Sequence, residues 1–381
     1  MSVVTPAQAT RNEEVSIGRS LGQRPELDGI RGLAVSLVVL SHIGQPLLPR
    51  SDLGIAIGRT FRPGFLGVDI FFVLSGFLIT TLLLDEYRIG RRISVQKFYA
   101  RRALRLLPAL VLFLFAYVVY ASITNLPSEP VQQSVWGALF YVANWQTVFH
   151  FDSLSSGLGH LWSLSIEEQF YLVWPCLVLM SLRARNRFIG LVLILALILI
   201  VVAHRIDLLE TVKPYPELFV RTDSRVDMLL VGSLASWLWF HRLLPTRGLT
   251  VAASIAVPSL VWLAWGVSPH QVNLYEWGFT AFAALVAVVV IAVLDTDWFG
   301  ARVFRLRPLR LLGRVSYGLY LWHLPIFKFV PEHTSTWPSG FRLLLSLGLT
   351  AFAVTASWHL LERRANRLRH RFSPQTLMQK T

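Results

Sequence analysis

Long apolar segments recur along almost the whole chain, and they restrict its fold more than any other feature. A segment of about 20 predominantly apolar residues can span a bilayer as an α-helix. Of the 381 residues, 54% are hydrophobic and only 15% are charged, which excludes an ordinary soluble domain. The pattern predicts an all-α, polytopic membrane helical bundle with ten transmembrane helices, at residues 30–48, 64–84, 104–122, 162–181, 188–204, 226–241, 249–267, 277–294, 312–330 and 341–361.

The charges between these segments predict how the bundle is oriented. Cytoplasmic loops of membrane proteins carry an excess of Lys and Arg. With the N-terminus in the cytoplasm, the inner segments hold 27 Lys and Arg residues and the outer segments hold 8. An eleventh apolar segment, 135–149, would spoil this bias if it crossed, because every later loop would change sides. We therefore expect cytoplasmic N- and C-termini, and a segment 135–149 that is either re-entrant or interfacial.

Composition also limits the domains and the classes of function. The net charge of +14 could indicate a nucleic-acid partner, but the basic residues cluster beside the apolar segments, so we expect none. Cys176 is the only cysteine, which excludes a disulfide framework and a Cys-based metal site, and no metal is expected. The first residues lack the apolar core of a signal peptide. We expect a disordered cytoplasmic tail (1–26), a membrane domain (27–362) and a basic cytoplasmic tail (363–381).

Several polar residues interrupt the apolar segments, and charged groups are costly in lipid. Arg31 and His42 are eleven residues apart on one predicted helix, so they share a stripe and lie about 16 Å apart along its axis. Arg102 and Arg105 have i, i+3 spacing, so they can face one target. The predicted topology orders these groups by depth: arginines at the inner mouth, imidazoles at mid-depth, and carboxylates toward the outside (Arg31, Arg102, Arg105; His42, His323; Asp69, Glu167, Glu168, Asp227).

Each polar group also has a structural interpretation. The arginines of the inner mouth could be orientation signals alone, and His42 could be a packing residue. Arg225 and Asp227, in the segment RTDSRVD, could form surface ion pairs. Gly76 shares the face of Asp69, which favours close helix packing but does not explain the carboxylate.

Three consecutive polar residues, Glu167, Glu168 and Gln169, lie within one predicted span. Because they point in three directions, at least one of them needs a polar partner or a water-filled cavity.

The same residues form six motifs in an order that resembles the membrane acyltransferase 3 family. The resemblance runs from Leu27 to about Glu362, nearly the whole chain. It is carried by Arg31-x10-His42, Phe71-Phe72-x-x-Ser75-Gly76, Arg102-x-x-Arg105, WSLSIEEQFY (162–171), Arg225-x-Asp227 and SYGLYLWH (316–323).

This resemblance implies a polytopic membrane O-acyltransferase. Members of the family modify surface polysaccharides, lipopolysaccharide, glycolipids and macrolides. The resemblance implies ten spans, an acyl-CoA donor and His42 as the catalytic base. Some relatives carry an extra C-terminal hydrolase-like domain. The sequence ends at Thr381 without one, so we expect direct transfer by the membrane domain.

We therefore expect a cytoplasmic acyl-CoA, with acetyl-CoA as the first choice, and no tightly bound cofactor. Guanidinium groups offer bidentate donors to phosphates, so Arg31, Arg102 and Arg105 are the expected donor-binding residues. His42 would remove the proton of the acceptor hydroxyl. Either Asp69 or Glu167 would orient His42, and a route through an acyl-histidine is also open. A substrate-positioning role is expected for Ser75, Glu168, Arg225, Asp227, Tyr320 and His323.

The sequence leaves the acceptor and some rival classes open. A hydroxyl of a cell-surface glycan or glycolipid is the first choice, and a macrolide or other small alcohol is the alternative. In each case we expect a multi-pass protein of the plasma membrane. A transporter or flippase would use the same polar stripe as a path, but transporters commonly contain internal repeats, and none is visible. A non-catalytic scaffold is the third possibility. Acyl transfer in detergent, where no gradient exists, would distinguish the enzyme from a transporter.

Overall fold

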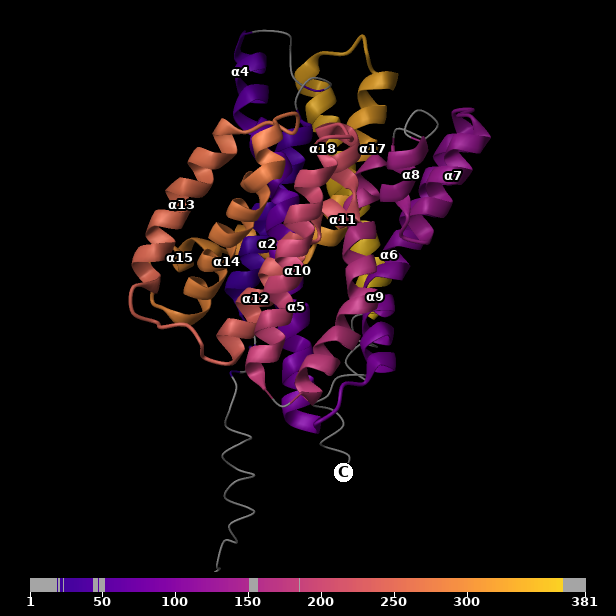
Figure 1. The fold of residues 1–381 in the computed structure, drawn as a ribbon. Coiled ribbons are helices and arrows are strands. Elements are labelled where there is room, and N and C mark those ends of the chain that lie inside the picture. Colours follow the sequence, from indigo (N-terminus) through magenta and orange to yellow (C-terminus); the bar gives the residue numbers. More distant parts are fainter. Residues whose placement is uncertain are drawn as a thin grey trace, which may run out of the picture.

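The computed structural model describes residues 19, 21–22, 24–43, 47, 52–150, 157–184 and 186–365, which form helices and connecting segments with no strand. The long helices run side by side in Figure 1, and each of the ten predicted ranges overlaps one of them. They are α2 (Pro25–His42), α5 (Gly67–Gly90), α6 (Val95–Ile123), α9 (Trp162–Arg183), α10 (Arg187–Leu208), α12 (Asp227–Phe240), α13 (Leu249–Gly266), α14 (Phe279–Asp295), α17 (Ser316–His333) and α18 (Ser339–Ser357).

Not every one of these helices meets the length and apolarity of a membrane span. Six candidate spans do so among the described residues, and they contain α5, α6, α10, α13, α14 and α18. The all-helical membrane fold is therefore confirmed, whereas the ten crossings and the orientation of the termini stay predictions. The predicted tails 1–26 and 363–381 lie outside the described residues, apart from the few residues beside α2 and after α18.

Shorter helices connect the long ones. They are α4 (Asp52–Phe61), α7 (Ser128–Leu139), α8 (Ala143–His150), α11 (Thr222–Arg225), α15 (Ala301–Phe304) and α16 (Arg307–Arg314), with 3₁₀- or π-helical turns η1 (Arg62–Leu66), η3 (Gly159–Leu161), η4 (Pro214–Leu218), η5 (Leu274–Gly278) and η6 (Trp358–Glu362). The segment 135–149 is not one helix, because Tyr141 has a φ of 55° and turns the chain between α7 and α8. The re-entrant or interfacial placement of this segment stays a prediction.

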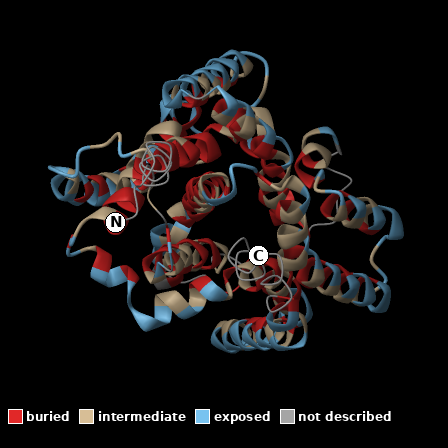
Figure 2. Ribbon diagram, turned by 90° about the horizontal axis from the view of Figure 1, so that it is seen from below, coloured by how far each residue is buried: buried red, intermediate tan, exposed pale blue. Residues whose placement is uncertain are grey.

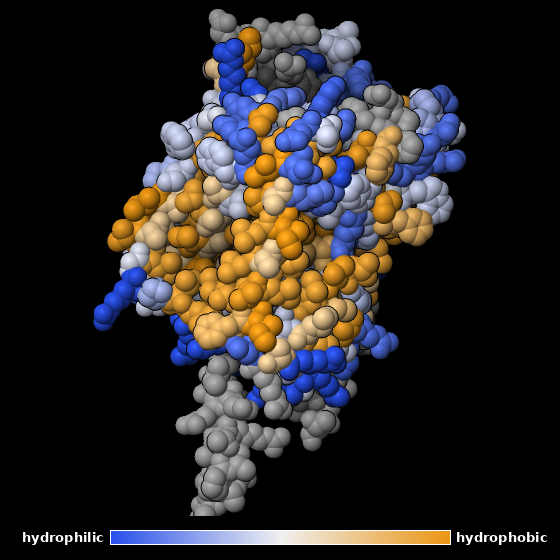
Figure 3. Space-filling view, in the orientation of Figure 1, coloured by the Kyte–Doolittle hydropathy of each residue, from blue (hydrophilic) through white to orange (hydrophobic). Residues whose placement is uncertain are grey.

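On the face seen in Figure 3, apolar surface forms a band across the middle of the molecule, with polar surface at both ends. The outward faces of the peripheral helices supply it, and Trp262 of α13, Leu199 of α10 and Phe352 of α18 are all more than half exposed. Figure 2 shows the buried residues on the inward faces of the helices. This inversion of the usual soluble pattern is what a hydrocarbon solvent requires, because lipid does not penalise exposed apolar side chains.

The central helix is α5, and glycines bring α12 directly against its backbone. A Cβ atom added at Gly76 would lie 1.9 Å from the carbonyl oxygen of Leu229, and one added at Gly232 would lie 2.0 Å from that of Val73. The packing role predicted for Gly76 is therefore confirmed. This close contact leaves the opposite face of α5 free to line a cavity.

Candidate active site

A cavity of about 490 Å³ lies between α5, α6, α9 and α17. On α5 its lining residues recur every three or four positions, from Val68 through Ser75 to Glu86. That spacing is one face of an α-helix, so the cavity follows α5 for about 27 Å at 1.5 Å per residue. It is therefore long enough to connect groups at clearly different depths in the bundle.

Cationic side chains line the end of the cavity near the start of α6. Arg31, Arg101, Arg102 and Arg105 all contribute to this wall. Arg102 is neutralised by Glu168, with Nη2 to Oε1 at 2.5 Å, and its guanidinium carbon lies 3.4 Å from the ring centroid of Tyr171. The structure thus brings the three sequence-predicted arginines to one cavity.

Two of these arginines differ in their ion pairs. Arg31 lies 3.8 Å from a carboxylate oxygen of Asp28. In contrast, no ion pair of Arg105 occurs within the described part of the chain. Arg105 is therefore the cation most available to an anionic ligand in this cavity.

The polar triplet of α9 is fully partnered. The hydroxyl of Ser75 donates to Glu167 Oε1 at 2.9 Å, and Glu168 binds Arg102. Gln169 Nε2 donates to the carbonyl oxygen of Tyr141 at 2.8 Å. The prediction that at least one member of the triplet has a partner is confirmed for all three.

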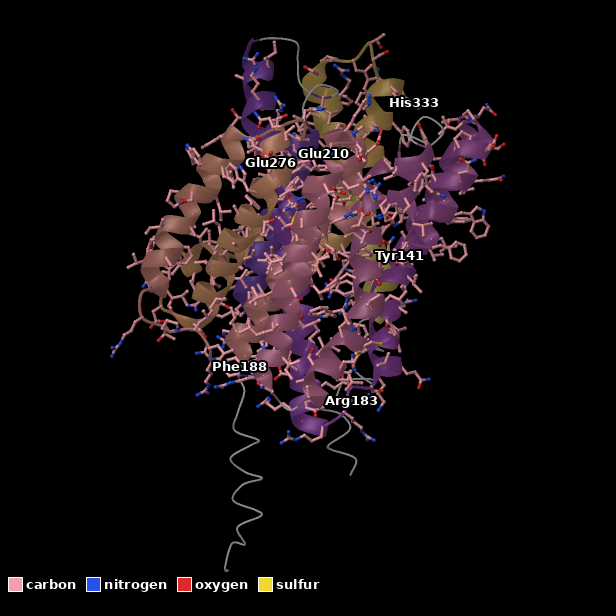
Figure 4. The ribbon with its side chains drawn as sticks, viewed as in Figure 1. Tyr141, Arg183, Phe188, Glu210, Glu276 and His333 are labelled. Atoms are coloured by element: carbon pink, nitrogen blue, oxygen red, sulfur yellow. The ribbon has the colours of Figure 1, made fainter. Side chains whose placement is uncertain are left out.

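The amide of Gln169 fixes the turn between α7 and α8 against the bundle. It also donates to Asn144 Oδ1 at 3.0 Å and accepts from the hydroxyl of Thr222 at 2.5 Å. Tyr141, at that turn, lines the cavity and lies between the two ends of the bundle in Figure 4. Tyr141 was missed in the sequence because nothing in the local pattern connects residue 141 to α9.

A hydroxyl pair lies at the other end of the cavity. The Tyr320 hydroxyl donates to the carbonyl oxygen of His160 at 2.6 Å. Because that bond uses its one proton, the hydroxyl of Ser163 must be the donor to the Tyr320 oxygen, which is 2.5 Å away. Tyr320 and Ser163 both line the cavity. Tyr320 was predicted from the sequence, whereas Ser163, which lies in the WSLSIEEQFY motif, was missed. His160 contributes only its backbone carbonyl oxygen to this pair.

His42 lies behind this wall and is not among the residues that line the cavity. Its Nδ1 is 2.8 Å from the carbonyl oxygen of Val38 and 3.4 Å from Nε2 of His323. His323 is fully buried, and its ring lies 5.8 Å from that of Tyr320. Phe71 lines the cavity and also packs against the apolar cluster around Val35 and Val39 of α2, which places it between the cavity and the helix that carries His42.

Asp69 and Asp227 take part in buried ion pairs away from the cavity. Asp69 pairs with Arg225, and Arg205 Nη1 lies 2.9 Å from Asp227 Oδ1; all four side chains are 0% exposed. The interpretation of Arg225 and Asp227 as a surface pair is therefore wrong.

The sequence showed only the neighbours of these residues along the chain, and their true partners lie on other helices. Asp69 is on α5, and Arg205 is on α10. Of the two carboxylates predicted to orient His42, Glu167 lines the cavity and Asp69 does not. Neither is a hydrogen-bond partner of His42 among the described residues.

Comparison with known proteins gives the family. Residues 24–362 match the family model described as "Acyltransferase domain". The chain belongs to this acyltransferase family. The prediction drawn from the six motifs is thereby confirmed, and so is the multi-pass placement in the cell membrane, which the six apolar spans also support.

Several bacterial proteins are similar along most of the chain. The peptidoglycan O-acetyltransferase OatA of Listeria monocytogenes is 33% identical over 360 residues, which cover 89% of this chain and 55% of the relative. The putative peptidoglycan O-acetyltransferase YrhL of Bacillus subtilis is 32% identical, with 89% and 54% covered. The O-acetyltransferase OatA of Staphylococcus aureus is 33% identical, with 89% and 56% covered.

The chain spans about half the length of these curated relatives. No solved structure shows a significant match to it.

Proposed function

We propose that this protein is an integral membrane O-acyltransferase that moves an acyl group, with acetyl as the first candidate, from cytoplasmic acyl-CoA to a hydroxyl of a cell-surface glycan or glycolipid. One observation carries the proposal: a single cavity runs along α5 from a cluster of arginines to the hydroxyl of Tyr320, which lies beside the His323–His42 pair. A donor with a charged head and a reactive thioester at the far end of a long arm has that same layout.

The arginine end suits the phosphates of the donor. Guanidinium groups bind phosphate through bidentate, charge-assisted hydrogen bonds. Arg105 has no competing ion pair within the described chain, so we assign it the main contact, with Arg31 beside it. Arg102 is already neutralised by Glu168 and stacked on Tyr171, so its role is to shape the wall.

The apolar part of the cavity suits the arm of the donor. Leu78, Ile79 and Leu82 line the stretch between the arginines and Ser75. A thioester carried along this face would reach the end of the cavity where Tyr320 and Ser163 lie, one side-chain layer from His42. Phe71 is the side chain that has to move for the thioester to meet the imidazole.

The chemical step then needs only a base and an attacking oxygen. Nε2 of His42 takes the proton of the acceptor hydroxyl while that oxygen attacks the thioester carbon. The carbon–sulfur bond breaks, and the thiolate of coenzyme A leaves and takes up the proton from the imidazolium. The alternative route, through an acyl-histidine, uses the same nitrogen as the nucleophile.

The acceptor is argued from the relatives. Two of them are named as peptidoglycan O-acetyltransferases, one of these as a putative one, which favours a cell-wall glycan hydroxyl for this chain as well. A macrolide or another small alcohol is the alternative. The match covers only 54–56% of these relatives, so the acceptor must be tested on this chain directly.

The test of the function is acyl transfer from acetyl-CoA by the purified full chain in detergent, where no gradient exists. His42→Ala should lower the rate by about 10²–10⁴-fold, the usual effect of losing a general base. His204→Ala is the matched control, because the His204 side chain is 42% exposed and contacts Asp223 rather than the cavity. Transfer at a near wild-type rate by the His42→Ala protein would refute the proposed mechanism.

The donor site has a separate test. Arg105→Gln should raise the KM for acetyl-CoA but leave the KM for a truncated thioester without the nucleotide unchanged, because only the former carries the phosphates. An equal rise for both donors would mean that Arg105 supports the fold of the cavity rather than the phosphates.

A further inference from the structure

Three histidines from distant parts of the chain form a row of rings behind the cavity wall. His323 of α17 lies in the middle, with its ring centroid 5.1 Å from that of His42 and 5.6 Å from that of His160. The His323 side chain is 0% exposed. A buried imidazole between two others needs an explanation, and its hydrogen bonds provide one.

Backbone carbonyls define where the proton of His323 lies. Its Nδ1 is 2.8 Å from the carbonyl oxygen of Tyr320 and 3.0 Å from that of Leu319. A carbonyl oxygen can only accept, so Nδ1 must carry the hydrogen, and Nε2 of the neutral ring has a free lone pair. A second proton on this fully buried ring would leave an uncompensated charge, which is costly.

A backbone carbonyl also fixes the position of the proton of His42. Its Nδ1 lies 2.8 Å from the carbonyl oxygen of Val38, so this nitrogen is the donor. The Nδ1 hydrogen of His42 therefore lies between that carbonyl and Nε2 of His323, which is 3.4 Å away. The other nitrogen of His42, Nε2, is left with the lone pair that a general base needs.

In many hydrolases a carboxylate accepts the hydrogen bond from the catalytic histidine and stabilises its protonated form. Here both candidate carboxylates are committed elsewhere, because Asp69 pairs with Arg225 and Glu167 accepts from Ser75. We infer that His323 is the positioning residue for His42: it accepts the Nδ1 hydrogen bond, holds the tautomer with a basic Nε2, and stabilises the imidazolium formed during transfer. This inference rests on the proposed role of His42 as the base.

The test compares two replacements of His323 in the purified full chain. In His323→Gln the amide oxygen can take the place of Nε2 as an acceptor, whereas His323→Leu keeps a similar volume without an acceptor. We expect the Leu variant to lose kcat by roughly 10- to 100-fold, the usual effect of losing a hydrogen bond to a charged group. The Gln variant should stay within a few-fold of the wild type.

If His323 only supported the fold, its replacement would change kcat and the KM for acetyl-CoA together. His323 does not line the cavity, so the KM for acetyl-CoA should be unchanged in both variants. His160→Gln is the matched control, because the His160 ring also packs against His323 but makes its hydrogen bond to the carbonyl oxygen of Leu321 rather than to His42. That control should keep the wild-type kcat.

Two outcomes overturn the inference: wild-type kcat in the Leu variant, or equal loss of kcat in the Leu and Gln variants. If thermal unfolding shows that the Leu variant is not folded, His323→Asn takes its place, because the amide of asparagine is too short to reach His42. The result for His42→Ala keeps the two proposals separate. Activity lost there but retained in His323→Leu defeats only the positioning role, whereas activity retained in His42→Ala defeats both.

Discussion

The buried pair of Asp69 and Arg225 gives the sharpest test of how the polar interior is organised. Both side chains are 0% exposed. Around the guanidinium, the carbonyl oxygen of Phe219 accepts a second hydrogen bond at 3.3 Å, and the ring centroid of Phe279 lies 3.6 Å from its central carbon. Within the described part of the chain, Asp69 is the only carboxylate in ion-pair contact with this guanidinium. Replacing Asp69 therefore leaves an uncompensated buried cation.

The size of the effect follows from that environment. Removing one partner of a buried ion pair costs about 3–5 kcal/mol, whereas replacing both partners with apolar residues of similar volume is often neutral. Asp69→Leu and Arg225→Met should each fall in the first range. The double variant should lie within about 1–2 kcal/mol of the wild type, so the two effects should be far from additive.

Unfolding in detergent, followed by circular dichroism for the four proteins of this cycle, measures the coupling. Acyl transfer by the double variant provides the second readout, and it should stay within about tenfold of the wild type, since Asp69 does not line the cavity. Additive destabilisation would refute the ion-pair argument. An Asp69→Leu protein as stable as the wild type, but with kcat reduced more than 100-fold, would instead restore Asp69 as the group that orients His42.

Two further predictions concern packing and topology. Gly76→Ala should destabilise the protein by about 1–3 kcal/mol or more, because its new methyl group would lie 1.9 Å from the backbone carbonyl oxygen of Leu229, which cannot move aside as a flexible side chain would. For the orientation, single cysteines in place of Arg183 and Glu210 lie at opposite ends of the bundle (Figure 4), with Cys176 changed to Ala. A membrane-impermeant maleimide added to intact cells should label the Glu210→Cys protein, and the Arg183→Cys protein only after permeabilisation.

The packing prediction has a matched control variant, and each of the two predictions has an outcome that would contradict it. Gly348→Ala is the matched control for packing, because a Cβ atom there would meet nothing within 4 Å, and the stability should not fall. Equal stability of the Gly76 and Gly348 variants would mean that α5 and α12 separate easily. Labelling of Arg183→Cys in intact cells would reverse the predicted orientation of the bundle.

Local features of the sequence were enough to place the long helices and one side of the site. The free energy of transferring an apolar segment into lipid is a property of that segment alone, so the ten apolar ranges each overlap a helix. Helical spacing likewise put Arg102 and Arg105 on one face, and both line the cavity. The turn at Tyr141 was not visible, because a positive φ at a non-glycine residue has no reliable signature in the sequence.

The partners of the buried charges could not be read from the chain. Asp69 and Arg225 are 156 residues apart, and His42 and His323 are 281 residues apart. Spacing shows which face of a helix a residue occupies, but it does not show which other helix that face meets. Hydrophobic length and periodicity are properties of a single segment, whereas an ion pair or a hydrogen bond exists only once two segments have packed together. For this reason the sequence alone determined the helical membrane bundle and the shared face of Arg102 and Arg105. The partners of Asp69 and His42 were decided only by how the helices pack together.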